Sequence, residues 1–302
     1  MKKSLLFLVL LILISAFSQV FAQEPERKGP PAVLYIVRED IKPGMMSAHN
    51  KHSATYANVF RTLGTPNHRI ALVPVAGSEN EVVYITGCDS YKELESILNA
   101  TDKTIAGASG NTKAELDRLD KEASLLHAGM RDMFANYRAD LSFNANIDIR
   151  TMRYFSINTV RVRPGHDAQY VDYLQKLVNV ARQKAKLDDL HIAAFQVISG
   201  TQIGTYMFFR PMKSLAELDV PMAMKMRAVM SDDAKKDADK AASDAIMSSE
   251  TSTYWTAPNM SYVEKDFAAG DPASWNTKPP MMAKPKPKKR VAKPVAPPPP
   301  TD

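Results

Sequence analysis

The sequence of 302 residues predicts an α+β protein that contains two tandem copies of one βαββαβ unit. The main observation is a turn that occurs twice, at Lys42-Pro43-Gly44 and at Arg163-Pro164-Gly165. Each turn follows a short apolar run and precedes a stretch of helical periodicity. Each copy then continues with two short apolar runs, another helical stretch and a last short run. A repeat of about half the mature length indicates a duplicated supersecondary unit.

The first copy is predicted from hydrophobic periodicity and from the turn residues between its elements. Apolar residues recur at helical spacing after Gly44, and Gly64-Thr65-Pro66-Asn67 ends that helix. The predicted elements are strand 32–38, helix 45–63, hairpin strands 70–75 and 81–86, helices 90–98 and 112–137, and closing strand 139–143.

The second copy repeats this order, and its segment SLAEL at 214–218 matches SYKEL at 90–94 in place and in kind. Its first helix carries an apolar stripe that includes Tyr170, Leu174 and Ala181. The other predicted elements are strand 154–162, hairpin strands 191–198 and 205–209, short helix 214–218, helix 222–249 and a closing strand within 254–262. We therefore expect two repeats, at 32–147 and 152–265.

The order βαββαβ is the ferredoxin-like arrangement, an antiparallel sheet with helices on one face. A strand followed by Pro-Gly and a helix resembles the dimeric α/β barrel superfamily, which includes NIPSNAP-like proteins and antibiotic-biosynthesis monooxygenase-like domains. The resemblance spans residues 32–263 and implies that the two ferredoxin-like units close a pseudo-dimeric α/β barrel within one chain. It also implies a pocket in each half, inside the barrel or between sheet and helices.

Residues 1–22 are typical of a signal peptide. Lys2 and Lys3 form a positive region, residues 5–17 are apolar, and Val20-Phe21-Ala22 precedes a predicted cleavage before Gln23. The apolar stretch is too short to span a bilayer, which needs ~20 residues. We therefore expect a soluble protein exported to the periplasm or the extracellular space, without a transmembrane anchor after cleavage.

Residues 271–302 are predicted to be a disordered tail rich in Pro and Lys. From Lys278 onward the tail holds seven Lys and Arg against Asp302, so it alone carries +6, which equals the net charge of the whole chain. The signal peptide carries +2, and the body between them therefore carries about −2. This distribution argues against a nucleic-acid partner, because no basic face lies on the predicted fold. The tail either contacts an anionic envelope polymer or lipid headgroup, or has no specific partner.

Two histidines on the first helix are candidate site residues. His49 and His52 lie three apart and so share one helix face. A metal site would need a third ligand from Glu39, Asp40 or His68, and from the sequence we assign no metal. His52 instead predicts a ligand-binding pocket with Tyr35 and Tyr56; the alternative is a histidine that fills a gap in the apolar stripe. The second copy has Tyr173 in the place of His52, so the two halves are expected to differ chemically.

The strand at 154–162 supplies a second group of candidates. Ser156 and Asn158 share a face that is too polar to pack against helices, and we therefore expect this face to line the barrel interior. Asn158, Tyr206 and Tyr35 could then orient a small ligand. The alternative is an interior filled by water or by paired polar groups.

The residue pattern favours a binding protein over an enzyme. It contains no catalytic triad, P-loop or dinucleotide fingerprint, and the single cysteine, Cys88, lacks a supporting base. We expect an exported protein that holds a small apolar or amphipathic ligand in a barrel pocket, with no cofactor. The alternative is a cofactor-free monooxygenase or isomerase of the same superfamily. A haem-dependent variant is a weaker alternative, which would need an axial histidine facing an apolar cavity.

Overall fold

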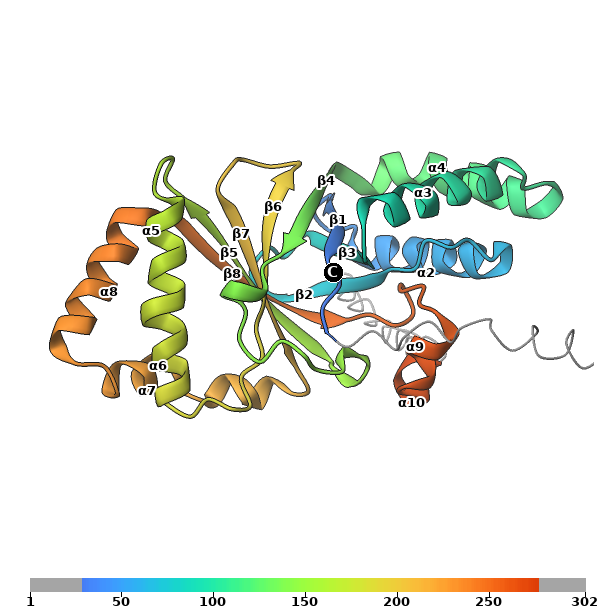
Figure 1. The fold of residues 1–302 in the computed structure, drawn as a ribbon. Helices are drawn as coiled ribbons and strands as arrows, with labels where there is room; N and C mark the ends of the chain where they lie inside the picture. Colours follow the sequence, from blue (N-terminus) through green and yellow to red (C-terminus); the bar gives the residue numbers. More distant parts are fainter. Residues whose placement is uncertain (1–28, 277–302) are drawn as a thin grey trace, which may run out of the picture.

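A closed barrel of eight antiparallel strands forms the centre of the protein (Figure 1). The structure is a computed structural model that describes residues 29–276; the predicted signal peptide and most of the predicted tail lie outside them. The strand order around the barrel is β1-β3-β2-β8-β5-β7-β6-β4. The strands are β1 Val33–Ile41, β2 Ile70–Ala76, β3 Glu81–Cys88, β4 His127–Tyr137, β5 Tyr154–Val162, β6 Ala193–Ser199, β7 Thr205–Met212 and β8 Ile246–Thr256.

The barrel consists of two four-stranded halves of identical strand order. The first half is β4-β1-β3-β2 and the second is β8-β5-β7-β6, and they join where β2 pairs with β8 and β4 pairs with β6. The registers agree as well, because Val37 opposes Tyr84 in the first half as Asn158 opposes Phe208 in the second. The predicted fold, two ferredoxin-like units that close a pseudo-dimeric barrel, is confirmed.

Helices cover the outer face of each half, on opposite sides of the barrel (Figure 1). The first half carries α2 Met46–Leu63, α3 Tyr91–Ala106 and α4 Gly110–Leu126. The second carries α5 Asp167–Asp172, a π-helical turn Tyr173–Val178, α6 Asn179–Lys184, a 3-10 turn Leu215–Asp219, α7 Met222–Ala228 and α8 Asp232–Ala245. Within residues 29–276, none of the helices combines the length and apolarity needed to span a bilayer.

The backbone conformation explains why glycine occurs in both Pro-Gly turns. Gly44 and Gly165 adopt φ values of +79° and +83°, a left-handed conformation that glycine adopts without steric cost. The basic residue that opens each turn also donates an equivalent backbone hydrogen bond. Lys42 N donates to Leu126 O at 2.9 Å, and Arg163 N donates to Ala245 O at 2.8 Å. The turn thus ties the end of the first strand to the residue that precedes the closing strand in each half.

The predicted closing strands are placed too late in both copies. Strand β4 begins at His127, inside the predicted helix 112–137, and β8 begins at Ile246, inside the predicted helix 222–249. Met133 and Tyr137, which suggested a helical stripe, both face the barrel core. A spacing of four residues fits a helix and an alternating strand equally well, so periodicity could not separate them. Residues Phe143 and Tyr262 form only isolated bridges, to Ile192 and Arg69.

The predicted tail also begins too early at residue 271. Helices α9 Lys265–Ala269 and α10 Pro272–Trp275 follow the second half. Trp275 is 9% exposed, and its Nε1 donates to the carbonyl oxygen of Arg150 at 2.8 Å. An ion pair between Arg153 and Asp271 lies beside it. The folded part therefore extends at least to residue 276.

Candidate functional site

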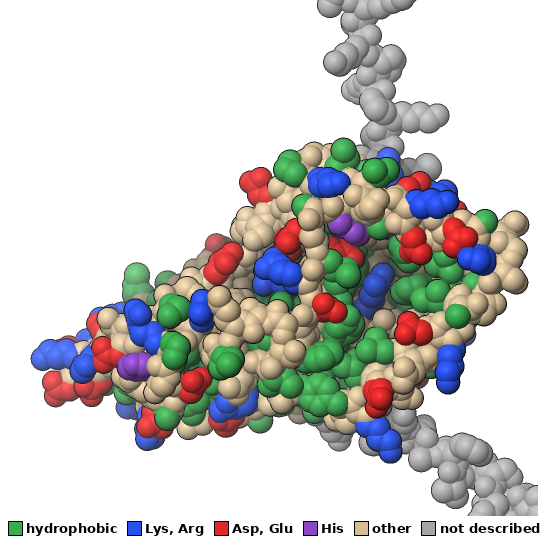
Figure 2. Space-filling view, turned by 90° about the horizontal axis from the view of Figure 1, so that it is seen from above, with side chains coloured by type: hydrophobic (Ala, Val, Ile, Leu, Met, Phe, Trp, Pro, Cys, Tyr) green, Lys and Arg blue, Asp and Glu red, His purple; other side chains and the backbone are tan. Residues whose placement is uncertain are grey.

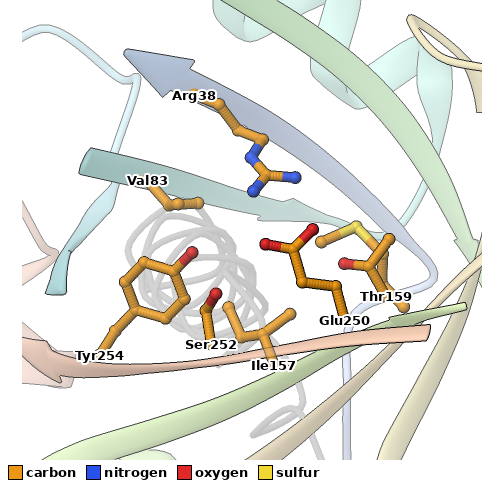
Figure 3. Close-up of a pocket in the computed structure, with 8 residues that line it drawn as sticks. Arg38, Val83, Ile157, Thr159, Glu250, Ser252 and Tyr254 are labelled. Atoms are coloured by element: carbon orange, nitrogen blue, oxygen red, sulfur yellow. The ribbon is translucent and has the colours of Figure 1, made fainter. Parts of the chain in front are cut away.

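A recess opens at the barrel end where β1 and β5 finish and β3, β7 and β8 begin. In the space-filling view from above, a separate surface hollow with hydrophobic walls and a basic side chain inside it lies on the right, the side of the first-half helices in Figure 1 (Figure 2). The recess is small and partly open to solvent. It is lined by Arg38, Val83, Ile157, Thr159, Met207, Glu250, Ser252 and Tyr254 (Figure 3).

A buried ion pair forms part of the recess wall. Arg38 binds Glu81 through two bonds, Nε to Oε2 at 2.9 Å and Nη2 to Oε1 at 2.6 Å. The Glu81 side chain is 4% exposed and also accepts a hydrogen bond from the Tyr254 hydroxyl at 2.9 Å. Burial, together with the Glu81 charge, raises the pKa of Tyr254 to about 12, so this hydroxyl is protonated at neutral pH. The pairing leaves Nη1 of Arg38 for another acceptor.

Glu250 faces Arg38 across the recess (Figure 3). Its side chain is exposed, and it forms no ion pair within the described part of the chain. Its charge nevertheless contributes to raising the pKa of Arg38, after the larger effects of burial, which lowers it, and of Glu81. The recess thus contains an unpaired carboxylate opposite the Arg38 guanidinium, of which only Nε and Nη2 are bound to Glu81.

The two halves contribute opposite charges to this end of the barrel. Arg131 and Glu250 occupy matching places on β4 and β8, because they oppose Arg38 and its counterpart Thr159 in the same register. Asp40 and Arg161 occupy matching places at the ends of β1 and β5. The charged residues on the inward strand faces at this end balance, with three cations and three anions: Arg38, Arg131, Arg161, Asp40, Glu81 and Glu250.

The predicted interior position of Asn158 is wrong. Its neighbours Ile157 and Thr159 bound the recess, so alternation along β5 places Asn158 on the outer face. There its amide donates to Ser249 Oγ at 2.9 Å and Thr251 Oγ1 at 2.8 Å. The polarity of this strand face reflects polar neighbours on β8, and the barrel interior takes the apolar face instead.

Tyr35 and Tyr206 also point away from the barrel interior. The Tyr35 hydroxyl donates to Asp132 Oδ2 at 3.0 Å, and its ring lies 5.5 Å from that of Phe134. In the other half, the Tyr206 hydroxyl donates to Asp167 Oδ1 at 3.2 Å and its ring lies 5.3 Å from that of Tyr170. These residues lie in different halves and share no pocket.

His52 and Tyr56 are the only two of the five predicted site residues that the described structure brings together. Their rings lie 5.2 Å apart between α2 and α4. Nε2 of His52 lies 2.9 Å from the carbonyl oxygen of Leu119 and must donate to it, because a carbonyl only accepts. The Tyr56 hydroxyl donates to Asp120. The geometry is that of a buried histidine with a satisfied hydrogen bond, the alternative stated from the sequence.

A separate cluster, Glu39, His49 and His127, lies between the first half of the barrel and α2. Glu39 Oε2 lies 2.7 Å from His49 Nε2 and 3.4 Å from His127 Nε2. The hydroxyl of Ser53, one helical turn beyond His49, lies 3.3 Å from the same His49 Nε2 and accepts a hydrogen bond from Tyr84 at 2.7 Å. Sequence spacing named Glu39 and His49 but missed His127, because 78 residues separate it from His49.

Electrostatics in this cluster favour an ionised Glu39 carboxylate and a neutral His127 imidazole. Burial opposes ionisation of Glu39, but the hydrogen bond from His49 and the nearby histidine charges outweigh it, so the pKa of Glu39 lies below its usual value. Burial is also the main cause that lowers the pKa of His127. Both groups are therefore in the states that bind a metal ion at neutral pH.

The second half fills the same place with apolar groups. The strand registers match Glu39 with Val160. They also match His127, which opposes the last residue of β1, with Ile246, which opposes the last residue of β5. His49 matches Tyr170, since each amide bonds to the residue just after the Pro-Gly turn. The counterparts Val160, Tyr170, Leu174, Phe208 and Ile246 all belong to one hydrophobic core.

The strand order decides the fold assignment. The chain has the dimeric α/β barrel fold. No family model and no curated protein sequence matches it.

Several solved structures are similar to this one. An anthrone oxidase-like protein is 12% identical, with a TM-score of 0.48 over 80% of this chain and 96% of that one. A chlorite dismutase variant of Candidatus Nitrospira defluvii is 8% identical, with a TM-score of 0.46 over 79% and 96%. A candidate monooxygenase of Lactobacillus acidophilus is 10% identical, with a TM-score of 0.43 over 75% and 94%. Such low similarity transfers no activity, ligand or residue role to this chain.

The recess does not fit the haem variant considered from the sequence. None of its eight lining residues is a histidine. His49 and His52 point into packed contacts between helix and sheet or between helices, and each is less than 9% exposed. The recess therefore lacks the axial histidine that this variant requires.

Proposed function

We propose that this protein is exported and binds one small, neutral amphipathic molecule in the barrel recess. The observation that supports this most directly is the unpaired Glu250 carboxylate opposite Arg38, above an apolar floor. Sites of this kind combine apolar walls with a few polar groups that fix orientation. Export is supported by the signal-peptide pattern at residues 1–22.

The apolar part of the ligand is expected to contact Val83, Ile157 and Met207. These side chains come from β3, β5 and β7 and bound the inner end of the recess. Met207 is flexible and polarisable, so it can adapt to ligands of different shape. The small size of the recess favours a compact molecule.

The polar part of the ligand is expected to lie between Glu250 and Arg38. Glu250 can only accept hydrogen bonds, whereas Nη1 of Arg38 and the Thr159 hydroxyl can donate. The six charged residues on the inward strand faces at this end of the barrel sum to zero, so neither an anion nor a cation gains a net attraction. A hydroxyl or carbonyl group fits this arrangement.

The buried pair of Arg38 and Glu81 supports a functional reason for this polarity. Buried ion pairs often stabilise a protein less than apolar side chains of similar size. The second half closes its side of the barrel with Thr159 and Thr205 at the matching places. Barrel closure therefore does not require the ion pair.

The free Glu250 carboxylate also favours a second candidate function, a cofactor-free isomerase. Glu250 can accept a proton from a carbon next to a carbonyl, and Nη1 of Arg38 can stabilise the charge that develops on the carbonyl oxygen. In a β,γ-unsaturated carbonyl compound, the proton then returns from Glu250 to the γ-carbon, and the double bond moves into conjugation with the carbonyl group. Glu250→Gln separates the two candidates, because it abolishes proton transfer while preserving a hydrogen bond to the ligand.

Native mass spectrometry of untagged protein purified from its own host tests the proposed function. We expect one retained small molecule per chain. Thr159→Trp, which places a large ring in the recess, is expected to abolish retention. The control Met247→Trp adds the same ring at an exposed position of β8 and should leave retention unchanged. Wild-type protein without a retained molecule, or equal retention in Thr159→Trp, would contradict the proposal.

A further inference from the structure

We propose that Glu39, His49 and His127 bind a single divalent first-row transition-metal ion, with zinc as the best match. Two imidazoles, one carboxylate and an open fourth position are a common zinc ligand set. The site lies on the outer face of the first half of the barrel, under α2, and is separate from the recess. Its proposal does not depend on the proposed ligand-binding function.

The geometry is close to that of a bound ion. Ligand atoms ~2.0–2.1 Å from a tetrahedral zinc lie about 3.3 Å from one another. Glu39 Oε2 and His127 Nε2 already lie 3.4 Å apart, and all three ligand atoms lie within 4.8 Å of one another. The His49 Nε2 to Glu39 Oε2 distance of 2.7 Å must lengthen, as a hydrogen bond gives way to two metal bonds.

The cluster is not satisfied by its protein neighbours. His49 is fully buried, yet its Nδ1 has no hydrogen-bond partner. Nε2 of His127 is buried and approaches Glu39 without a hydrogen bond. Unpartnered buried nitrogen atoms are costly and rare in native proteins. The unpartnered His127 Nε2 beside the Glu39 carboxylate points to a positively charged ligand.

The second half shows that the fold does not require these polar groups. Val160, Tyr170 and Ile246 occupy the matching places and pack into a continuous hydrophobic core. Replacing such a core by histidines and a carboxylate lowers stability unless the polar groups gain a partner. A metal ion supplies that partner in the first half alone.

The surroundings leave room for access and for a fourth ligand. The side chains of Glu39 and His127 are 14% and 18% exposed, so an ion can enter from their side. Ser53 lies beside His49 Nε2 and is held by Tyr84, at a place suited to orient a metal-bound water. His52 is not a ligand, because its Nε2 is bound to Leu119.

Zinc binding to untagged, chelator-treated protein tests this proposal by isothermal titration calorimetry. We expect one zinc ion per chain, with the His49 proton on Nδ1 so that Nε2 is free to bind the metal. Glu39→Gln and His127→Gln should each weaken binding by at least about tenfold. His191→Gln, the same change at a histidine of the second half, should leave the affinity unchanged. Cobalt absorption bands typical of tetrahedral coordination should appear only where zinc binds.

A variant that carries the second-half residues at the three ligand positions should still fold, so it separates loss of zinc binding from misfolding. The triple variant Glu39→Val, His49→Tyr, His127→Ile should give a cooperative thermal transition that zinc no longer shifts, whereas zinc should raise the Tm of the wild type. The proposal is overturned if wild-type protein takes up no zinc, or if the folded variants bind it with unchanged affinity.

Discussion

His49 and Tyr170 occupy the same place in the two halves of the barrel, and both are almost fully buried. His49 meets the carboxylate of Glu39, whereas Tyr170 packs in the hydrophobic core that contains Val160. The first half therefore has a polar cluster at the place where the second half has a hydrophobic core. This difference within one chain provides a built-in control for each experiment on the first half.

His52→Leu is expected to destabilise the protein by about 1 kcal/mol, because it removes the buried hydrogen bond that joins α2 to the Leu119 carbonyl of α4. Urea unfolding measures the change. Lys51→Leu, an exposed neighbour on α2, is the control and should change the free energy of unfolding by less than about 0.5 kcal/mol. Unchanged stability in His52→Leu, together with loss of a bound ligand, would instead support the site predicted from the sequence.

Two truncations at the C-terminus should have different effects. Deleting residues 278–302 is expected to leave the Tm nearly unchanged, because Pro-rich charged sequence buries little apolar surface. Deleting residues 271–302 also removes Trp275, and loss of a buried tryptophan side chain costs about 3–5 kcal/mol. Thermal melts of both truncations check this. A large effect of the shorter deletion would show that the tail packs on the fold.

Stability in the absence of metal should decrease as the pH falls from 7 to 5. Burial lowers the pKa of His127 in the folded state, so the unfolded chain binds the proton first, beginning near pH ~6.5. His68 behaves in the same way, also mainly through burial, and adds to the slope. His127→Gln should make the pH dependence shallower, measured by urea unfolding in chelator. A slope identical to that of the wild type would argue against this role of His127.

The mature protein is expected to begin at Gln23, because Val20-Phe21-Ala22 forms a small-x-small cleavage site. N-terminal sequencing of protein from the extracytoplasmic fraction measures this directly. Ala22→Arg should block cleavage and retain the longer chain. Secreted protein that still begins at Met1 would contradict the prediction.

Some elements could be predicted because their signals are local. The two Pro-Gly turns require a glycine with positive φ, and the helix that follows each turn has a clear apolar stripe. The closing strands could not be placed in this way, because Met133 and Tyr137 fit both a helix and a strand. Their assignment depends on the pairing of β4 with β1 and of β8 with β5, in each case with a strand about 100 residues earlier in the sequence.

The sequence by itself determined the duplication and the ferredoxin-like order of each half, since both follow from short-range patterns repeated along the chain. Only the tertiary structure decided which strand face lines the barrel and which residues meet at a site. Asn158 lies outside because closure of the barrel buried the face of Ile157, and a pattern of alternation does not say which face that is. His127 joins Glu39 and His49 because β4 pairs with β1, a long-range contact that no local spacing encodes.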